Sequence, residues 1–146
     1  MLDMNSDTRG VLEEQPLGYL MYRVVAVLQP KVAAQLQPLG LKLPEFVCLR
    51  VLSMGPGQSN AELARHTNVS PQAMNNVLRG LQDRGAVRRP ATVESGRALP
   101  AELTAEGAEL LKRAEAAVLA AEDEVLEALD TEQRRELKRL LAHAVT

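Results

Sequence analysis

Apolar residues recur at every third or fourth position along most of the chain, which is the spacing of amphipathic helices. Such a helix is predicted over residues 17–36, with a kink at Pro30. A second helix is predicted to begin near Pro44 and to end at residues 54–57, where Gly and Pro cluster. Residues 1–13 show no clear period and are expected to form a mobile tail.

The clearest helix signals lie in the middle of the chain. Ser70 is a good N-cap, Pro71 is a good first helical residue, and Gly85 is expected just beyond the C-terminus. A short helix is predicted before this one, over residues 60–67. The two helices have the lengths of a helix-turn-helix, and Asn68 can adopt the left-handed conformation that the turn requires.

A small hairpin and two closing helices are predicted for the rest of the chain. Residues 86–103 have the pattern of two short strands joined by a turn at residues 94–96. Thr104 is expected to cap a helix that reaches about Leu129, and Asp130 resembles the start of a capping box for the last helix. The predicted fold class is therefore mostly α with a small β-hairpin.

The composition excludes several classes of protein. The 146 residues fit one domain with a real core, and the single cysteine excludes an intrachain disulfide. No stretch approaches the roughly 18 apolar residues that cross a bilayer, and no signal peptide is visible, so we expect a cytoplasmic protein. No nucleophile–base pairing, glycine-rich phosphate loop or metal-ligand cluster is visible in the sequence. We therefore expect neither an enzyme nor a bound cofactor or metal.

The formal net charge of −2 conceals an asymmetry along the chain. Residues 58–97 contain six basic and three acidic residues, whereas residues 101–136 contain four basic and eleven acidic residues. This distribution is typical of a basic working module on an acidic support. Solvated surface charge without a partner is the alternative explanation.

The helix that follows Ser70 has an apolar face, expected to pack inward, and an opposite face of amides and a guanidinium. Such side chains bond adenine and guanine in the major groove, while the helix N-terminus at Ser70 and Pro71 can meet a phosphate. A polar surface without a partner is the alternative, although asparagine is unfavourable inside helices. The candidate base-reading residues are Gln72, Asn75, Asn76 and Arg79.

Basic residues also bracket the predicted hairpin. Arg88 and Arg89 lie on its first strand, and Arg97 lies beside its turn. A basic hairpin directly after a major-groove helix would form a wing that contacts the minor groove or the DNA backbone.

The chain resembles the MarR (multiple antibiotic resistance regulator) family of bacterial transcription factors over about residues 17–144. The order of the predicted elements also matches that family. The resemblance rests on Ser-Pro-Gln at 70–72, Leu-Gln-Asp-Arg-Gly-Ala-Val-Arg-Arg at 81–89, Arg97, and Glu-Leu-Thr-Ala-Glu-Gly at 102–107.

The resemblance implies a winged helix-turn-helix over residues 42–103, within one MarR-like domain that spans residues 14–146. The flanking residues 14–38 and 104–146 would supply the dimerisation helices. The resemblance implies a homodimeric repressor or activator that binds double-stranded DNA at an inverted-repeat operator. Of the two, we expect a repressor, with an activator as the alternative. Many family members release DNA when a small, often phenolic, ligand binds, so a small aromatic ligand is a further expected partner.

One position departs from the family pattern. Wings of this family usually carry Asp-x-Arg at the tip, whereas Ser95, Gly96 and Arg97 stand at the matching positions here. Arg97 therefore lacks its usual carboxylate neighbour, and Glu94 is a candidate substitute.

Apolar side chains at both ends of the chain are the candidate dimer contacts. The leucine face of the last helix needs a partner, either within the chain or in a second copy. Tyr19 and Tyr22 are candidates either for a ligand pocket or for core and dimer contacts, and no ligand-binding residue is assigned. The candidate interface residues are Leu17, Leu137, Leu140 and Leu141.

Two further residues have ordinary and functional interpretations. Cys48 stands among apolar residues such as Phe46 and is expected to be an inert core residue, with a redox switch as the alternative. His66, beside the predicted turn, is expected to be a surface residue, with a position near a phosphate as the alternative.

A winged-helix protein–protein adaptor that does not bind DNA is the alternative function. Such an adaptor would not need a face of amides and arginine beside a basic hairpin. DNA affinity that falls steeply with salt concentration would separate the two functions.

Overall fold

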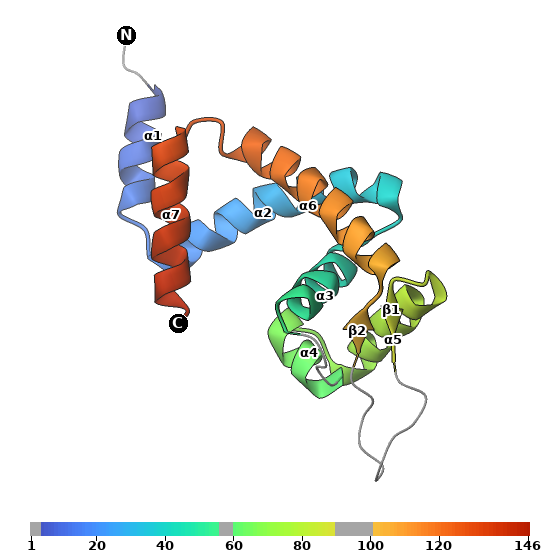
Figure 1. Ribbon diagram of the computed structural model, residues 1–146. Coiled ribbons are helices and arrows are strands. Elements are labelled where there is room, and N and C mark those ends of the chain that lie inside the picture. Colours follow the sequence, from blue (N-terminus) through green and yellow to red (C-terminus); the bar gives the residue numbers. More distant parts are fainter. Residues whose placement is uncertain (1–3, 56–59, 90–100) are drawn as a thin grey trace. The chain divides into compact units, whose positions relative to one another are not determined.

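The computed structural model describes residues 4–55, 60–89 and 101–146 (Figure 1). The described elements are mostly helices with one two-stranded antiparallel sheet, so the predicted fold class is confirmed. In chain order they are α1 (Met4–Glu13), α2 (Leu17–Leu36), the 3-10 helix η1 (Gln37–Leu39), α3 (Leu43–Met54), α4 (Asn60–Thr67), α5 (Pro71–Asp83), β1 (Val87–Arg88), β2 (Glu102–Leu103), α6 (Ala105–Val125) and α7 (Thr131–Ala144).

The chain divides into two compact units. Unit 1 comprises residues 1–31 and 121–146, and unit 2 comprises residues 32–120. The division crosses α2 directly after Lys31, next to Pro30 inside that helix, and crosses α6 directly after Ala120. None of the helices in the described ranges combines the length and the hydropathy of a membrane-spanning segment.

Unit 2 is built around α3, α4 and α5, which pack against one another, with β1 against α5 and β2 against α3 (Figure 1). The two strands pair with Val87 opposite Leu103 and Arg88 opposite Glu102. The core is aliphatic, as expected for a chain with three aromatic residues. Its largest fully buried side chains are Leu36, Leu49, Leu52, Leu63, Met74, Leu78, Leu81 and Cys48.

The base of the hairpin is tied to the start of α6. The Thr104 amide donates a hydrogen bond to the Ala86 carbonyl at 3.1 Å, and the Thr104 hydroxyl donates one to the Gly85 carbonyl. The same hydroxyl accepts a hydrogen bond from the Gly107 amide at 3.0 Å, which caps α6 as expected. These contacts hold the end of α5, the start of β1 and the start of α6 together.

Unit 1 contains α1, the first fifteen residues of α2, the end of α6 and the whole of α7. Lys31 on α2 pairs with Glu124 on α6 at 2.6 Å. Residues 4–13, which lie in the segment expected to be a mobile tail, form the helix α1. Leu12 of this helix is half-buried and lines a shallow hollow with Leu20 of α2.

The turn between α6 and α7 lies earlier than predicted, because α6 ends at Val125 rather than near Leu129. Arg134 closes this turn by donating hydrogen bonds to the carbonyls of Leu126 at 2.8 Å and Leu129 at 3.0 Å. The capping box at Asp130 is confirmed: the Asp130 carboxylate accepts from the amide of Gln133, whose side chain accepts from the Asp130 amide.

Candidate nucleic-acid interface

The turn between α4 and α5 has the geometry of a helix-turn-helix. Asn68 adopts a left-handed conformation with φ of 56°, as its position in the sequence predicts. The Val69 amide then donates a hydrogen bond to the Ala64 carbonyl at 3.3 Å, and Ala64 is buried, so the two helices can approach closely. The helix-turn-helix prediction is therefore confirmed in its local geometry.

The N-terminus of α5 is capped by Ser70, as predicted. Its hydroxyl accepts a hydrogen bond from the Ala73 amide at 3.1 Å, and Pro71 occupies the first turn. Ser70 and Pro71 are both exposed, so the positive end of the helix dipole is accessible from solvent. This arrangement suits contact with a phosphate group.

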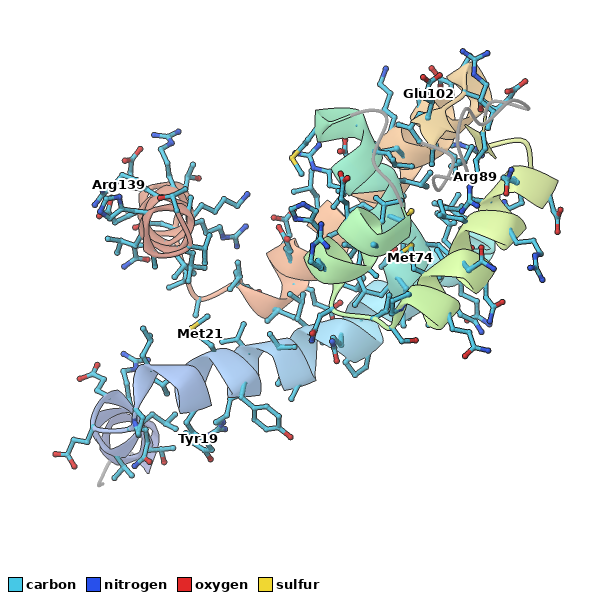
Figure 2. The ribbon with its side chains drawn as sticks, turned by 90° about the horizontal axis from the view of Figure 1, so that it is seen from below. Tyr19, Met21, Met74, Arg89, Glu102 and Arg139 are labelled. Carbon is cyan, nitrogen blue, oxygen red and sulfur yellow. The ribbon has the colours of Figure 1, made fainter. Side chains whose placement is uncertain are left out.

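The two faces of α5 divide as the sequence predicts. Met74, Leu78 and Leu81 are completely buried, and Figure 2 shows the Met74 side chain among the helices of unit 2. On the opposite face Gln72, Asn76 and Arg79 are exposed, while Asn75 is half-buried. The structure therefore brings three of the four candidate base-reading side chains onto one solvent-facing helix surface, with Asn75 at its margin.

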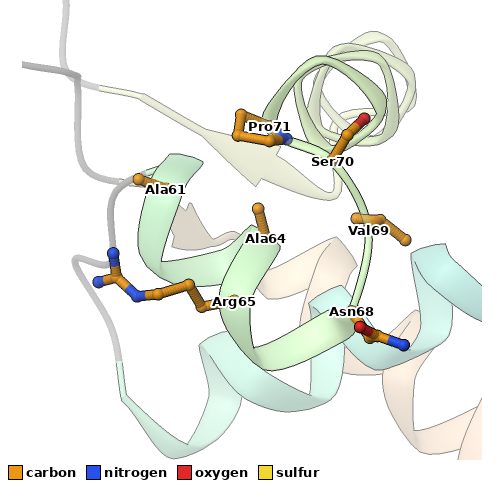
Figure 3. A pocket seen from close by; sticks show the side chains of 7 residues that line it. All are labelled: Ala61, Ala64, Arg65, Asn68, Val69, Ser70 and Pro71. Atoms are coloured by element: carbon orange, nitrogen blue, oxygen red, sulfur yellow. The ribbon is translucent and has the colours of Figure 1, made fainter.

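Arg65 is a basic residue at this surface that was not among the candidate site residues. It is exposed in the last turn of α4 and lines a hollow of about 490 Å³ with Asn68, Ser70 and Pro71 (Figure 3). Its position five residues before the Ser70 cap is a sequence signal that could have identified it. A cation here adds to the positive dipole end of α5.

Arg88 and Arg89 have different environments at the base of the hairpin. Arg88 is exposed and pairs with Glu102 on the neighbouring strand at 3.4 Å. Arg89 is half-buried (Figure 2), and burial lowers its pKa, while the nearby positive charge of Arg79 lowers it further. Arg88 is therefore the more accessible cation of the two. Arg97 lies outside the described residues, as do Glu94, Ser95 and Gly96.

Cys48 is fully buried in α3, as expected. Burial raises the pKa of its thiol to about 12, and the positive charge of Arg89 opposes this rise without cancelling it. The thiol is therefore protonated at neutral pH, which is the opposite of the environment that a redox-sensing cysteine needs. His66 is exposed on α4, as expected for a surface residue. The described residues contain no cluster of three or more histidine, cysteine or acidic side chains that could hold a metal ion.

The candidate dimer residues all lie in unit 1 and are exposed in the single chain. Leu17 has 68% of its surface exposed, and Leu140 has 50%. Tyr19 and Tyr22 are exposed as well, so neither belongs to the core of this chain; Figure 2 shows Tyr19 and Met21 standing out from α2. The remaining exposed large apolar residues of this unit are Val11, Val24, Val25, Val27, Leu137, Leu141 and Val145.

Comparison with known proteins relates this structure to a family. A profile of the MarR family matches residues 39–98. The chain is 64% identical over 132 residues to the HTH-type transcriptional repressor Rv2887 of Mycobacterium tuberculosis, covering 90% of this chain and 95% of that protein.

Two solved structures of the MarR family protein Rv2887 resemble the fold. The structure of its complex with DNA matches with a TM-score of 0.79 at 59% identity, and covers 91% of this chain and all of the other. The structure of its complex with salicylic acid matches with a TM-score of 0.77 at 63% identity, and covers 91% of this chain and 98% of the other. The helix-turn-helix geometry, the family profile and the extent of the identity agree, and the chain therefore belongs to the MarR family.

Proposed function

We propose that this chain is a homodimeric transcriptional repressor that binds an inverted-repeat operator through unit 2 and releases it when a small aromatic ligand binds. The exposed face of α5, formed by Gln72, Asn76 and Arg79 beside the capped helix N-terminus, is the observation on which the proposal depends. Its amides and guanidinium match the donors and acceptors of base edges in the major groove.

Most of the remaining candidate residues would contact the DNA backbone. Ser70, Pro71 and the N-terminal amides of α5 would bind one phosphate, and Arg65 would reinforce that contact. Arg88 and Arg97 of the wing would contact the backbone or the minor groove, and Asn75 would contribute from the margin of the exposed face. Arg89 is assigned a supporting role, because it is half-buried and therefore less accessible than Arg88.

Unit 1 would form the dimer. Large apolar side chains such as Leu17, Tyr22 and Leu140 are half or more exposed in the single chain, and a second copy would remove them from water. Two α5 helices related by a twofold axis would then enter successive major grooves about 34 Å apart on one face of the duplex. The winged helix-turn-helix over residues 42–103 would thus bind DNA, and the flanking helices would form the dimer.

The effector assignment rests on the relatives. The protein Rv2887 has been solved in complexes with salicylic acid and with p-aminosalicylic acid. We assign this chain the same class of ligand, an aromatic acid. A regulator that acts by binding DNA needs no catalytic centre, so the proposal includes no enzymatic activity, and it places the protein in the cytoplasm with its DNA.

Selection of bound duplexes from a random pool tests this function. A repressor of this type should select an inverted repeat, and the logarithm of its affinity should fall linearly and steeply with the logarithm of salt concentration. Salicylate should weaken binding to the selected duplex. A protein–protein adaptor would select no common sequence, and that result would overturn the proposal.

A further inference from the structure

The C-terminal end of α5 is joined to a distant part of unit 2 by one arginine. Arg84, the C-cap of α5, donates hydrogen bonds from Nη1 to the Gly40 carbonyl at 2.9 Å and from Nη2 to the Leu39 carbonyl at 2.7 Å. These acceptors lie 44 and 45 residues earlier, in the connection between α2 and α3. We call this pair of hydrogen bonds the Arg84 fork.

The local backbone explains why two carbonyls are available there. The η1 helix ends at Leu39 and is followed by its C-cap, Gly40, which has φ of 67°. The last carbonyls of a helix have no partner further along the same helix. A β-carbon on Gly40 would lie 3.4 Å from Nη1 of Arg84, an ordinary contact distance, so glycine is favoured here by the left-handed backbone rather than by lack of space. The turn is thus shaped to accept the two donors.

The guanidinium suits this contact in a way that an ammonium does not. Its planar donors point in fixed, parallel directions and can engage two neighbouring carbonyls at once, whereas lysine presents one nitrogen on a flexible chain. Hydrogen bonds with a charged donor are also stronger than neutral ones. The fork therefore fixes both the distance and the angle between the end of α5 and the connection.

Recognition of bases requires α5 to be held at a defined position and angle. Bidentate contacts demand placement within about 0.5 Å and 10–20°, so a small tilt of α5 would misplace its amides and guanidinium. Arg84 lies five residues beyond Arg79, roughly 7.5 Å along the helix axis, and so anchors the end of α5 opposite the Ser70 cap.

We propose that Arg84 is a positioning residue for sequence recognition, and that its fork with Leu39 and Gly40 sets the tilt of α5 needed to read base edges. The inference rests on the proposed function. It differs from two simpler roles. An ordinary stabilising contact would change unfolding without changing sequence preference, and a direct phosphate contact would act through charge on every duplex alike.

The test compares two duplexes, an inverted repeat selected by the wild-type protein and a scrambled sequence of the same length and composition. Arg84→Met removes both donors, and Arg113→Met, an exposed arginine of α6 in the same unit, is the charge-matched control. We expect Arg84→Met to lower affinity for the selected repeat about ten-fold relative to that control, with affinity for the scrambled duplex within about two-fold of it. Arg84→Lys, which keeps the charge, should lose part of the preference for the selected repeat while keeping the wild-type salt dependence.

Gly40→Ala tests the fork from the acceptor side without altering α5 or the net charge, because a side chain strains the left-handed turn that presents the two carbonyls. It should reduce the same preference, and its effect should not add to that of Arg84→Met if the two residues act through one contact. Thermal unfolding monitors the folded state of each variant.

Equal losses on both duplexes in Arg84→Met, with Arg84→Lys at wild-type affinity, would identify a phosphate contact and overturn the inference. Unchanged preference for the selected repeat in Arg84→Met and Gly40→Ala would overturn it as well. Failure of the proposed function is distinguishable, because the wild-type protein would then select no duplex at all.

Discussion

Gly107 at the start of α6 lies so close to the carbonyl oxygen of Ala86 that a β-carbon on Gly107 would overlap it. The contact joins the first turn of α6 to the backbone between α5 and β1. Because the obstacle is backbone rather than the end of a flexible side chain, relief requires one of these segments to move. Glycine at this position is therefore a requirement of packing, not of φ.

We predict that Gly107→Ala lowers the free energy of unfolding by about 2–3 kcal/mol, since overpacking forces the backbone apart. Gly80→Ala is the control, because Gly80 is a helical glycine with nothing within 4 Å of its would-be β-carbon. Alanine there should stabilise α5 by about 0.5–1 kcal/mol. Chemical denaturation of both variants measures the difference, and equal stabilities would contradict the close approach.

Elements with strong local signals were predictable from the sequence. The capped start of α5 and the left-handed Asn68 depend on residues within a few positions of each other, and both predictions are confirmed. The capping box at Asp130 is local in the same sense.

What the sequence did not reveal depends on tertiary contacts. Helix α1 forms although no clear period within residues 1–13 indicates it, and its Leu12 lines a hollow with residues of α2. The early end of α6 is closed by Arg134, eight residues beyond the carbonyl of Leu126. The Arg84 fork joins residues more than 40 positions apart, and a single sequence contains no signal that such distant residues are in contact.

We predict that Arg79→Ala lowers affinity for the selected operator by about 1–3 kcal/mol, because a bidentate contact to one base is lost. Discrimination should relax at one base-pair position in each half-site. Arg113→Ala provides the control for loss of charge. Titration of operator duplexes substituted one position at a time measures both effects, and a variant with wild-type affinity would exclude Arg79 from base reading.

We predict that Cys48 does not react in the folded protein. With its pKa raised from an ordinary value of 9.0 to about 12, the thiol is protonated at pH 8, and it is also fully buried. A thiol-specific reagent should therefore label the denatured chain at least 100-fold faster than the native one, as estimated from exposure and thiolate fraction. Rapid native labelling would favour the redox alternative.

The same burial makes stability depend on pH in the alkaline range. The thiolate is favoured in the unfolded chain, so the contribution of Cys48 is fully present below pH 9 and is lost as the pH rises from 9 towards 12. The free energy of unfolding should fall by about 1 kcal/mol per pH unit more in the wild-type protein than in Cys48→Ala over this range. Parallel pH profiles would show that the thiol titrates normally.

The last prediction concerns the dimer. Deletion of residues 131–146 removes α7 and, with it, Leu137, Leu140 and Leu141. These three leucines are exposed in the single chain, so they are not part of its core. We expect sedimentation to show a monomer. In the full-length chain, Leu140→Glu should weaken the dimer by placing a charge in an apolar interface, whereas Arg139→Gln, on an exposed residue of the same helix, is the control.

Loss of the dimer should also change DNA binding in a defined way. A monomer presents one α5 to one half-site, so the gain from simultaneous binding of two half-sites disappears. Affinity for the inverted repeat should fall to that for an isolated half-site, while the wild-type protein binds the repeat far more tightly. A truncated chain that still sediments as a dimer would instead place the interface on the apolar residues of α1 and α2, such as Val11, Leu17 and Tyr22.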